Sequence, residues 1–170
     1  TCGRKDNNWT FQGSIASSGC QLELSSDPVQ AIKRIGASGQ ISLKAARHIS
    51  LSAGADVLTA STGTVSMDAE GGDLTMSGTA SITATNSSVR MNASGSVTLG
   101  QVTAANVSVV ADTGAIVNAA GSSKNVTATN LRLAADDAIG AADRHLTTNV
   151  ATLTALSTGT NSAGIYLTED

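Results

Sequence analysis

The sequence contains few aromatic residues. Only 2% of its 170 residues are aromatic, and these are Trp9, Phe11 and Tyr166. A compact enzyme of this length normally anchors its core with several large rings, because each ring buries a large apolar area. Proline occurs once, as Pro28, which excludes collagen and a proline-rich linker. The length predicts one domain, and its core must be built from small aliphatic side chains.

Charge and long apolar runs are scarce too. Charged residues make up 14% of the chain, against about 25% in typical proteins. The formal net charge of −3 divides into +3 over residues 1–50 and −6 over residues 51–170, and the whole-chain charge gives no nucleic-acid-binding signature. No apolar run reaches the roughly 18 residues of a transmembrane helix. The chain does not open like a signal peptide, so we expect any export signal to have been removed or to lie outside it.

Small residues dominate what is present. The chain has 27 Ala, 22 Ser, 21 Thr and 17 Gly, and from residue 39 onward a short phrase recurs: apolar, small polar, apolar, any residue, alanine. The clearest copies are Ile41–Ala45, Ile49–Ala53, Val65–Ala69 and Val89–Ala93, with weaker copies such as Leu131–Leu133. Alternation with period two places the apolar residues on one face of a β-strand. Turn-forming residues separate the copies.

The spacing of the copies predicts a β-solenoid. The first apolar residue of each copy falls at positions 41, 49, 57, 65, 74, 82, 89, 97, 107, 116 and 126. A sandwich or barrel has similar spacing, but a sandwich draws on large inward side chains from two sheets. Near-identical phrases at a regular step are typical of stacked coils. We therefore predict an all-β fold, a parallel β-helix over residues 36–170, with roughly five to eight coils stacked at about 4.8 Å. Such a narrow tube explains the shortage of large rings.

Residues 1–35 break this pattern and are predicted to form an atypical N-terminal cap. The ends of a solenoid expose an apolar cross-section and unpaired backbone, which Trp9 and Phe11 would cover. Residues 29–34 are expected to form a short helical or irregular entry. A flexible tail is the alternative interpretation of the whole segment.

Cys2 and Cys20, the only cysteines, are predicted to form a disulfide within this cap. The bond would stabilise the fold by roughly 3 kcal/mol through loop closure, and an exported location favours it over free thiols. Neither a CxxC pair nor nearby histidines accompany them, so the spacing is not that of a zinc site. Bonds from each cysteine to a neighbouring subunit are the alternative.

Few residues offer reactive chemistry. His48 and His145 are the only neutral-pH acid–base groups, and we expect both to lie in exposed turns. Asp136 and Asp137 form the only adjacent acidic pair, but the aromatic platforms that usually accompany glycosidase carboxylates are absent. Gly71–Leu74 resembles one partial copy of a calcium-binding nonapeptide, which needs stacked repeats to bind the ion, so we expect a turn there. We predict no catalytic residue, cofactor or bound metal.

Two stretches resemble a known family. GASGQISLKAARHISLSAGADV (residues 36–57) resembles the repeats of filamentous-haemagglutinin-like secreted adhesins of bacteria. AIGAADRHLTTNVATLTALS (138–157), followed by GIYLTED (164–170), resembles a phrase common in the very large β-strand-repeat surface proteins of that group. The resemblance, over residues 36–170, implies a right-handed parallel β-helix, two-partner-type export from a Gram-negative cell, and roles in adhesion, biofilm or cell–cell contact. The family's amino-terminal secretion domain has no counterpart here, so we expect a fragment or processed piece.

We therefore expect an extracellular structural and adhesive segment. Its expected partners are identical subunits stacked head to tail into a fibre, or glycans or proteins on host or neighbouring cells. Candidate end-capping or subunit-contact residues are Trp9, Phe11, Ile165, Tyr166 and Leu167, because the last coil would present an open edge that grows without closing. The alternatives are a carbohydrate-active β-helix enzyme that uses the acidic pair, and a trimeric spike of a phage or secretion apparatus.

Overall fold

The structure is a computed structural model that describes residues 13–17, 22–24, 31–34, 40–59, 62–159 and 164–170, with side chains from residue 40 onward. These residues contain 15 strands and no helix, so none of them belongs to a helix that could span a membrane. The strands are β1 (Gly13–Ser17), β2 (Leu22–Leu24), β3 (Ala31–Arg34), β4 (Ile41–Ala45), β5 (Ile49–Leu51), β6 (Asp56–Thr59), β7 (Val65–Ala69), β8 (Leu74–Met76), β9 (Ser81–Ala93), β10 (Val97–Leu99), β11 (Gln101–Ala111), β12 (Ile116–Asn118), β13 (Val126–Ala135), β14 (Leu146–Ser157) and β15 (Leu167–Glu169).

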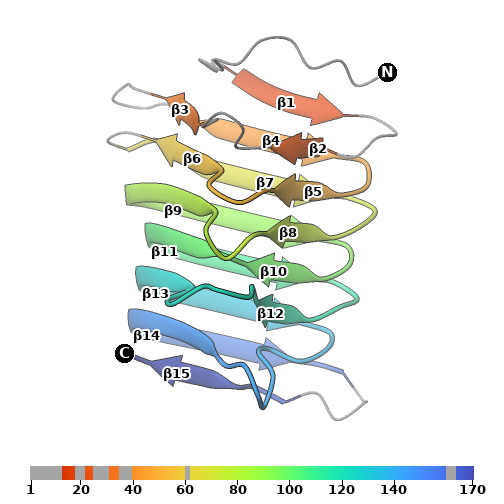
Figure 1. Ribbon diagram of the computed structural model, residues 1–170, viewed down its shortest axis with the longest axis vertical. Helices are drawn as coiled ribbons and strands as arrows, with labels where there is room; N and C mark the ends of the chain where they lie inside the picture. Colours follow the sequence, from red (N-terminus) through yellow and green to blue (C-terminus); the bar gives the residue numbers. More distant parts are fainter. Residues whose placement is uncertain (1–12, 18–21, 25–30, 35–39, 60–61, 160–163) are drawn as a thin grey trace.

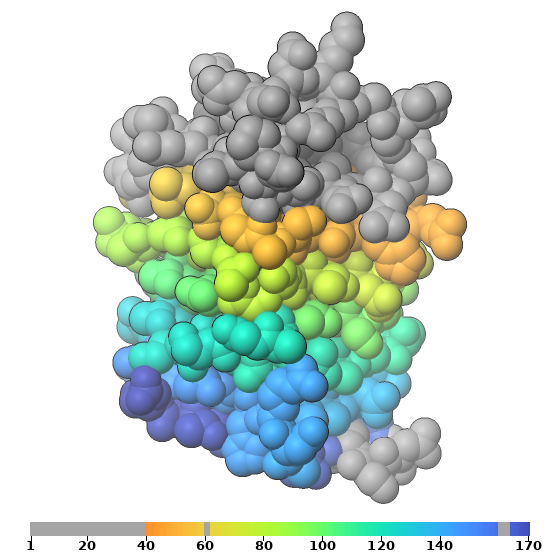
Figure 2. Space-filling view, viewed as in Figure 1, coloured from red at the N-terminus to blue at the C-terminus, as the bar shows by residue number. Residues whose placement is uncertain are grey.

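The strands wind into a parallel β-solenoid of about five turns. Figure 1 shows the coils stacked as a column, with β1 toward one end and β15 at the other. One coil contains β4, β5 and β6, which pair in parallel with β7, β8 and the first part of β9 in the next coil. Figure 2 shows the successive coils as bands of colour that follow the chain order. The predicted all-β parallel solenoid is therefore confirmed.

Rows of stacked aliphatic side chains fill the interior. One row in the ten-stranded sheet contains Ile41, Val65, Val89, Val107 and Leu131, each at most 3% exposed. A row in the five-stranded sheet contains Ile49, Leu74, Val97, Ile116 and Ile139, all fully buried. Every first apolar position predicted from the repeat spacing is buried. Because equivalent residues lie one strand spacing apart, small aliphatic side chains pack on their counterparts and fill the tube.

Four long strands give the solenoid its corner. Strands β9, β11, β13 and β14 each run from the last segment of one coil into the first segment of the next (Figure 1). The alternation of buried and exposed residues is interrupted in the middle of each strand, and the β9–β11 register shifts between Ala104 and Asn106. The chain therefore changes direction at this corner of the coil while its pairing with the neighbouring strands continues.

The chain before residue 36 contributes strands to the same ladders. Strands β1, β2 and β3 pair in register with β4, β5 and β6. The expected helical or irregular entry over residues 29–34 is wrong for its described part, since residues 31–34 form β3. The reason is register: Ile32 lies opposite Val57, at the position that the inward row requires. That residues 1–35 act as a cap stays a prediction.

One polar pair lies inside the tube. Asn125 is fully buried and Asn118 is 8% exposed. The Asn125 Nδ2 atom donates to Asn118 Oδ1 at 3.0 Å and to the Leu99 carbonyl oxygen at 2.8 Å. Its Oδ1 atom accepts the Thr147 N–H at 3.0 Å. The amide therefore joins the turn between β12 and β13 to the coils on both sides.

Candidate functional site

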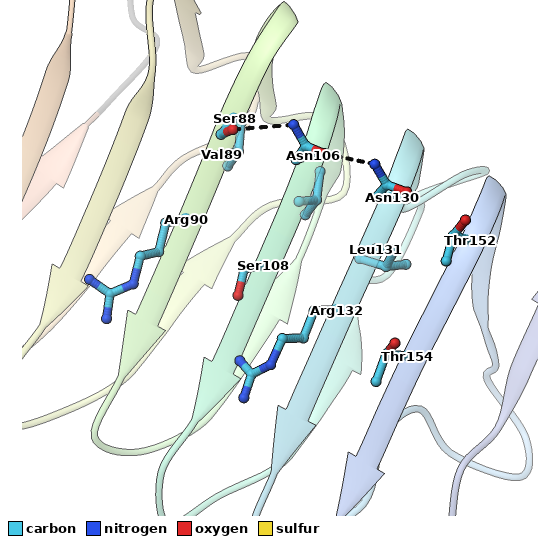
Figure 3. Close-up of a pocket in the computed structure, with 11 residues that line it drawn as sticks. Ser88, Val89, Arg90, Asn106, Ser108, Asn130, Leu131, Arg132, Thr152 and Thr154 are labelled. Atoms are coloured by element: carbon cyan, nitrogen blue, oxygen red, sulfur yellow. Dashed lines mark hydrogen bonds between the residues drawn. The ribbon is translucent and has the colours of Figure 1, made fainter.

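The candidate site is a groove on the outer surface, at the corner where the long strands bend. It has a volume of about 340 Å³ and crosses β9, β11, β13 and β14 (Figure 3). Because these strands stack along the solenoid axis, the groove runs parallel to that axis. Val89, Val107 and Leu131 contribute to its lining while being at most 3% exposed, and the rest of the lining is two rows of polar side chains.

The first row is a ladder of amides and hydroxyls, which we call the amide row. Register places Ser88, Asn106, Asn130 and Thr152 opposite one another in turn. Asn106 Nδ2 donates to Ser88 Oγ at 3.4 Å, and Asn130 Nδ2 donates to Asn106 Oδ1 at 2.8 Å (Figure 3). Each amide carries two N–H donors and an oxygen with two lone pairs. The ladder therefore leaves donors and acceptors available to a ligand.

The second row contains the two arginines of the groove, and we call it the arginine row. Arg90, Ser108, Arg132 and Thr154 lie opposite one another in turn. Both guanidinium groups are exposed and extend toward the same side of the sheet (Figure 3). Two strand spacings, about 9.6 Å, separate their positions along the axis. The row thus alternates a cationic group with a hydroxyl.

The positive charge of the arginine row is uncompensated. Among the described residues neither guanidinium lies in an ion pair. The two lysines with described side chains are both paired, Lys44 with Glu70 and Lys124 with Asp170, each at 2.6 Å. The hydrogen bond that Lys44 donates to Glu70 raises the pKa of Lys44, and the one that Lys124 donates to Asp170 lowers the pKa of Asp170. The groove therefore offers two arginine side chains that can form ion pairs with an anionic ligand.

The predicted contact residues at the C-terminal end lie where the solenoid leaves core positions open. Ile165 is 47% exposed and continues the row of Ile139, while Tyr166 and Leu167 are half-buried. The sequence reasoning missed Leu153, which lies opposite Leu131 and is 41% exposed. The repeat spacing could not have located it, because the coil step varies along this row: it is 18 residues from Val89 to Val107, 24 from Val107 to Leu131 and 22 from Leu131 to Leu153.

Four other predicted residues lie outside the described part of the chain. They are Cys2, Trp9, Phe11 and Cys20. The disulfide and the aromatic cover of the first coil therefore stay predictions.

The histidines take part in the stacking of turns. Nδ1 of the half-buried His48 accepts the Asp73 N–H at 2.9 Å, and Asp73 Oδ1 accepts the Ser96 N–H at 2.8 Å. His48 thus differs from the exposed turn residue that was expected, because its ring bridges to the next coil. His145 is exposed, and its Nδ1 atom lies 3.0 Å from Thr168 Oγ1.

The acidic pair and the glycine-rich turn lie away from the groove. Asp136 and Asp137 are exposed, directly after β13, and do not line it. Gly71–Leu74 forms the expected turn into β8. A Cβ atom on Gly71 would lie 2.6 Å from the Ala46 carbonyl oxygen, so close stacking of turns requires glycine there. No cluster of three metal-ligating side chains occurs in the part of the chain that the structure describes.

A signal for the groove was present in the sequence. Arginine occupies the second position of two copies of the phrase, at Arg90 and Arg132. Period-two alternation turns both outward but does not show that they share one row. That conclusion needs the coil register, because one coil step between them spans 18 residues and the other 24, from Val89 to Val107 and from Val107 to Leu131.

No protein-family model, curated protein or solved structure matches this chain. The β-solenoid fold is established by the strand pairing alone.

Proposed function

We propose that this chain is a structural and adhesive segment of an extracellular bacterial surface protein, and that identical subunits stack head to tail through their solenoid ends. The resemblance of residues 36–57, 138–157 and 164–170 to secreted adhesins supports an extracellular bacterial location. The observation that carries the stacking is the exposure of core-row residues at the C-terminal end.

Leu153 and Ile165 occupy inward positions that no further coil covers among the described residues. They are 41% and 47% exposed, whereas the residues opposite them, Leu131 and Ile139, are 3% and 0% exposed. A further coil would bury both. Burial of a leucine or isoleucine side chain contributes about 1.5–3 kcal/mol, so this end favours a partner with the same inward rows.

The backbone at this end favours a strand as that partner. Strand β15 pairs with β14 only at Leu146–Thr148. From residue 149 to residue 157, β14 has a strand partner on one side only among the described residues. At the opposite edge, β1 pairs with β4 and with no other strand in the part of the chain that the structure describes. All strands are parallel, so a second copy translated along the axis meets β14 with the correct direction, in a contact that grows without closing.

Replacement of Leu153 by lysine tests this stacking. We expect the unaltered chain to form elongated assemblies in electron micrographs, and Leu153→Lys to weaken self-association roughly 10- to 150-fold, because a buried leucine is lost and a charge takes its place. Sedimentation velocity over a range of protein concentrations measures the association.

The matched control is Thr127→Lys, which adds the same charge at an exposed position of β13, outside the groove and away from the unpaired edge of β14. It should leave self-association unchanged. Only monomers of the unaltered chain at both low and physiological salt, or equal losses in the two variants, would overturn head-to-tail stacking.

A further inference from the structure

We propose that the outer groove binds a linear polysaccharide of carboxylated sugars, a polyuronate, lying parallel to the solenoid axis. This inference rests on the adhesive part of the proposed function and names the ligand class for it. It is carried by side chains of β9, β11 and β13; of the groove lining, only Thr152 and Thr154 lie on β14, the strand of the stacking end.

The groove carries positive charge that matches a carboxylated ligand. The Arg90 and Arg132 guanidinium groups are exposed, have no ion-pair partner among the described residues, and extend to the same side of the groove. A guanidinium presents parallel N–H donors that match the two oxygens of a carboxylate. The chain as a whole carries a net charge of −3, so these two cations define a local preference rather than a general attraction for anions.

The spacing of the two arginines along the axis matches a repeat of two sugars. The arginine row presents a guanidinium at Arg90, a hydroxyl at Ser108 and a guanidinium at Arg132, on three successive strands about 4.8 Å apart. One pyranose unit of an extended polysaccharide is about as long as one strand spacing. Where successive sugars face opposite ways, every second carboxylate points to the protein. A polyuronate of this shape therefore aligns a carboxylate with each arginine and a hydroxyl with the serine between them.

The amide row offers hydrogen bonds that suit sugar hydroxyls. Asn106 and Asn130 are held in register by their own hydrogen bonds, so they are oriented before a ligand arrives and lose little freedom on binding. Each amide retains a donor and an acceptor for a ligand. Sugar hydroxyls both donate and accept, and a chain of them running along the axis meets one amide or hydroxyl on each of four strands.

Other extended polyanions fit less well. Single-stranded nucleic acids are held largely by stacking of bases on aromatic rings, and the groove contains no aromatic side chain. Its two cations are also few against the closely spaced phosphates of a nucleic acid. An acidic peptide offers carboxylates but no array of hydroxyls for the amide row.

The test measures binding of fluorescent mannuronate oligosaccharides to the full chain by anisotropy. Mannan oligosaccharides of the same length serve as the uncharged counterpart, and dextran sulfate and poly-L-glutamate as other polyanions. We expect the mannuronate to bind best and its affinity to fall with salt. Arg90→Gln and Arg132→Gln should each weaken binding roughly 5-fold, and the double variant roughly 25-fold.

The matched control is Arg47→Gln, which removes the same charge from an exposed arginine outside the groove. It should leave the affinity for mannuronate unchanged, and circular dichroism should be the same for all variants. An equal loss with Arg47→Gln would overturn the proposal, as would equal or tighter binding of mannan, dextran sulfate or poly-L-glutamate. No binding of mannuronate by the unaltered chain would overturn it as well.

The two proposals fail separately. Self-association depends on Leu153 and is read by sedimentation, whereas glycan binding depends on Arg90 and Arg132 and is read on the unaltered chain at a dilution where sedimentation shows monomers. Absence of glycan binding by these monomers, with assembly intact at higher concentration, would overturn the groove assignment alone.

Discussion

At the scale of single residues, the direction in which a side chain points decides what it contributes. Outward positions tolerate Ser, Thr, Asn or Arg, because water satisfies them. Inward positions are mostly aliphatic; the buried polar exceptions among the described residues are Thr59, Asn118, Asn125 and Thr148, of which Asn125 is fully buried. Period-two alternation predicts the aliphatic rows well. It does not predict a buried amide, because Asn125 follows a turn and its partners lie on other coils.

Asn125→Ala should therefore destabilise the fold. The change leaves the Thr147 N–H and the Asn118 Oδ1 atom without the partner that Asn125 gives them, and a buried polar group left unsatisfied costs about 1–3 kcal/mol. We expect a lower urea midpoint in circular dichroism. Asn149→Ala is the control, since Asn149 is exposed and such a change stays within about 0.5 kcal/mol. Equal midpoints for the two variants would contradict the role given to the amide.

At the scale of elements, the strand segments were predictable and their connections were not. The spacing of the phrase located β4 at Ile41, β7 at Val65 and the second half of β9 at Val89, because each carries its own alternation. It took the step from Val97 to Val107 as one interval and so missed Val102, which begins a further inward segment of β11. Alternation breaks at the corner, where the strand bends but the ladder continues.

Strand β15 shows how an element can depend on one side chain. It pairs with β14 over three residues, and Glu169 adds two contacts: it accepts from the Thr148 hydroxyl and from the Val150 N–H, both at 2.6 Å. The hydroxyl first, and then the backbone N–H, hold the pKa of Glu169 below its usual value. The same direction applies to Asp170 beside Lys124.

Acid should therefore loosen β15. A carboxyl group whose pKa is lowered by folding contributes stability above its unfolded pKa, and that contribution is lost as the pH falls through the folded pKa. We expect hydrogen-exchange protection of Leu167–Glu169 to fall between neutral pH and about pH 3, ahead of protection in β10. The double variant Glu169→Gln, Asp170→Asn should show low protection that does not change with pH. A pH dependence in that variant equal to that of the unaltered chain would count against this origin.

At the scale of the whole molecule, the sequence predicted the stacked core of the solenoid, and the structure adds the groove on its outer surface. A core of stacked small residues was inferred from the repeat, since large rings do not fit every coil. The groove was not inferred, because Arg90 and Arg132 become neighbours of one row only through the coil register. The open C-terminal end was expected from Ile165, and Leu153 extends it to a second row.

In a solenoid of this kind, a core substitution should destabilise the adjacent coils more than the distant ones. Met91 is fully buried in the middle of its row, between Met67 and Val109. Met91→Ala should destabilise the fold by about 2–5 kcal/mol through the cavity it leaves. Because each coil contacts only its neighbours, native-state hydrogen exchange should quicken in β7 and β11 more than in β14. Arg90→Ala, at the adjacent outward position, should change stability by no more than about 0.5 kcal/mol. Equal loss of protection in all coils after Met91→Ala would instead mean that the solenoid unfolds as one cooperative unit.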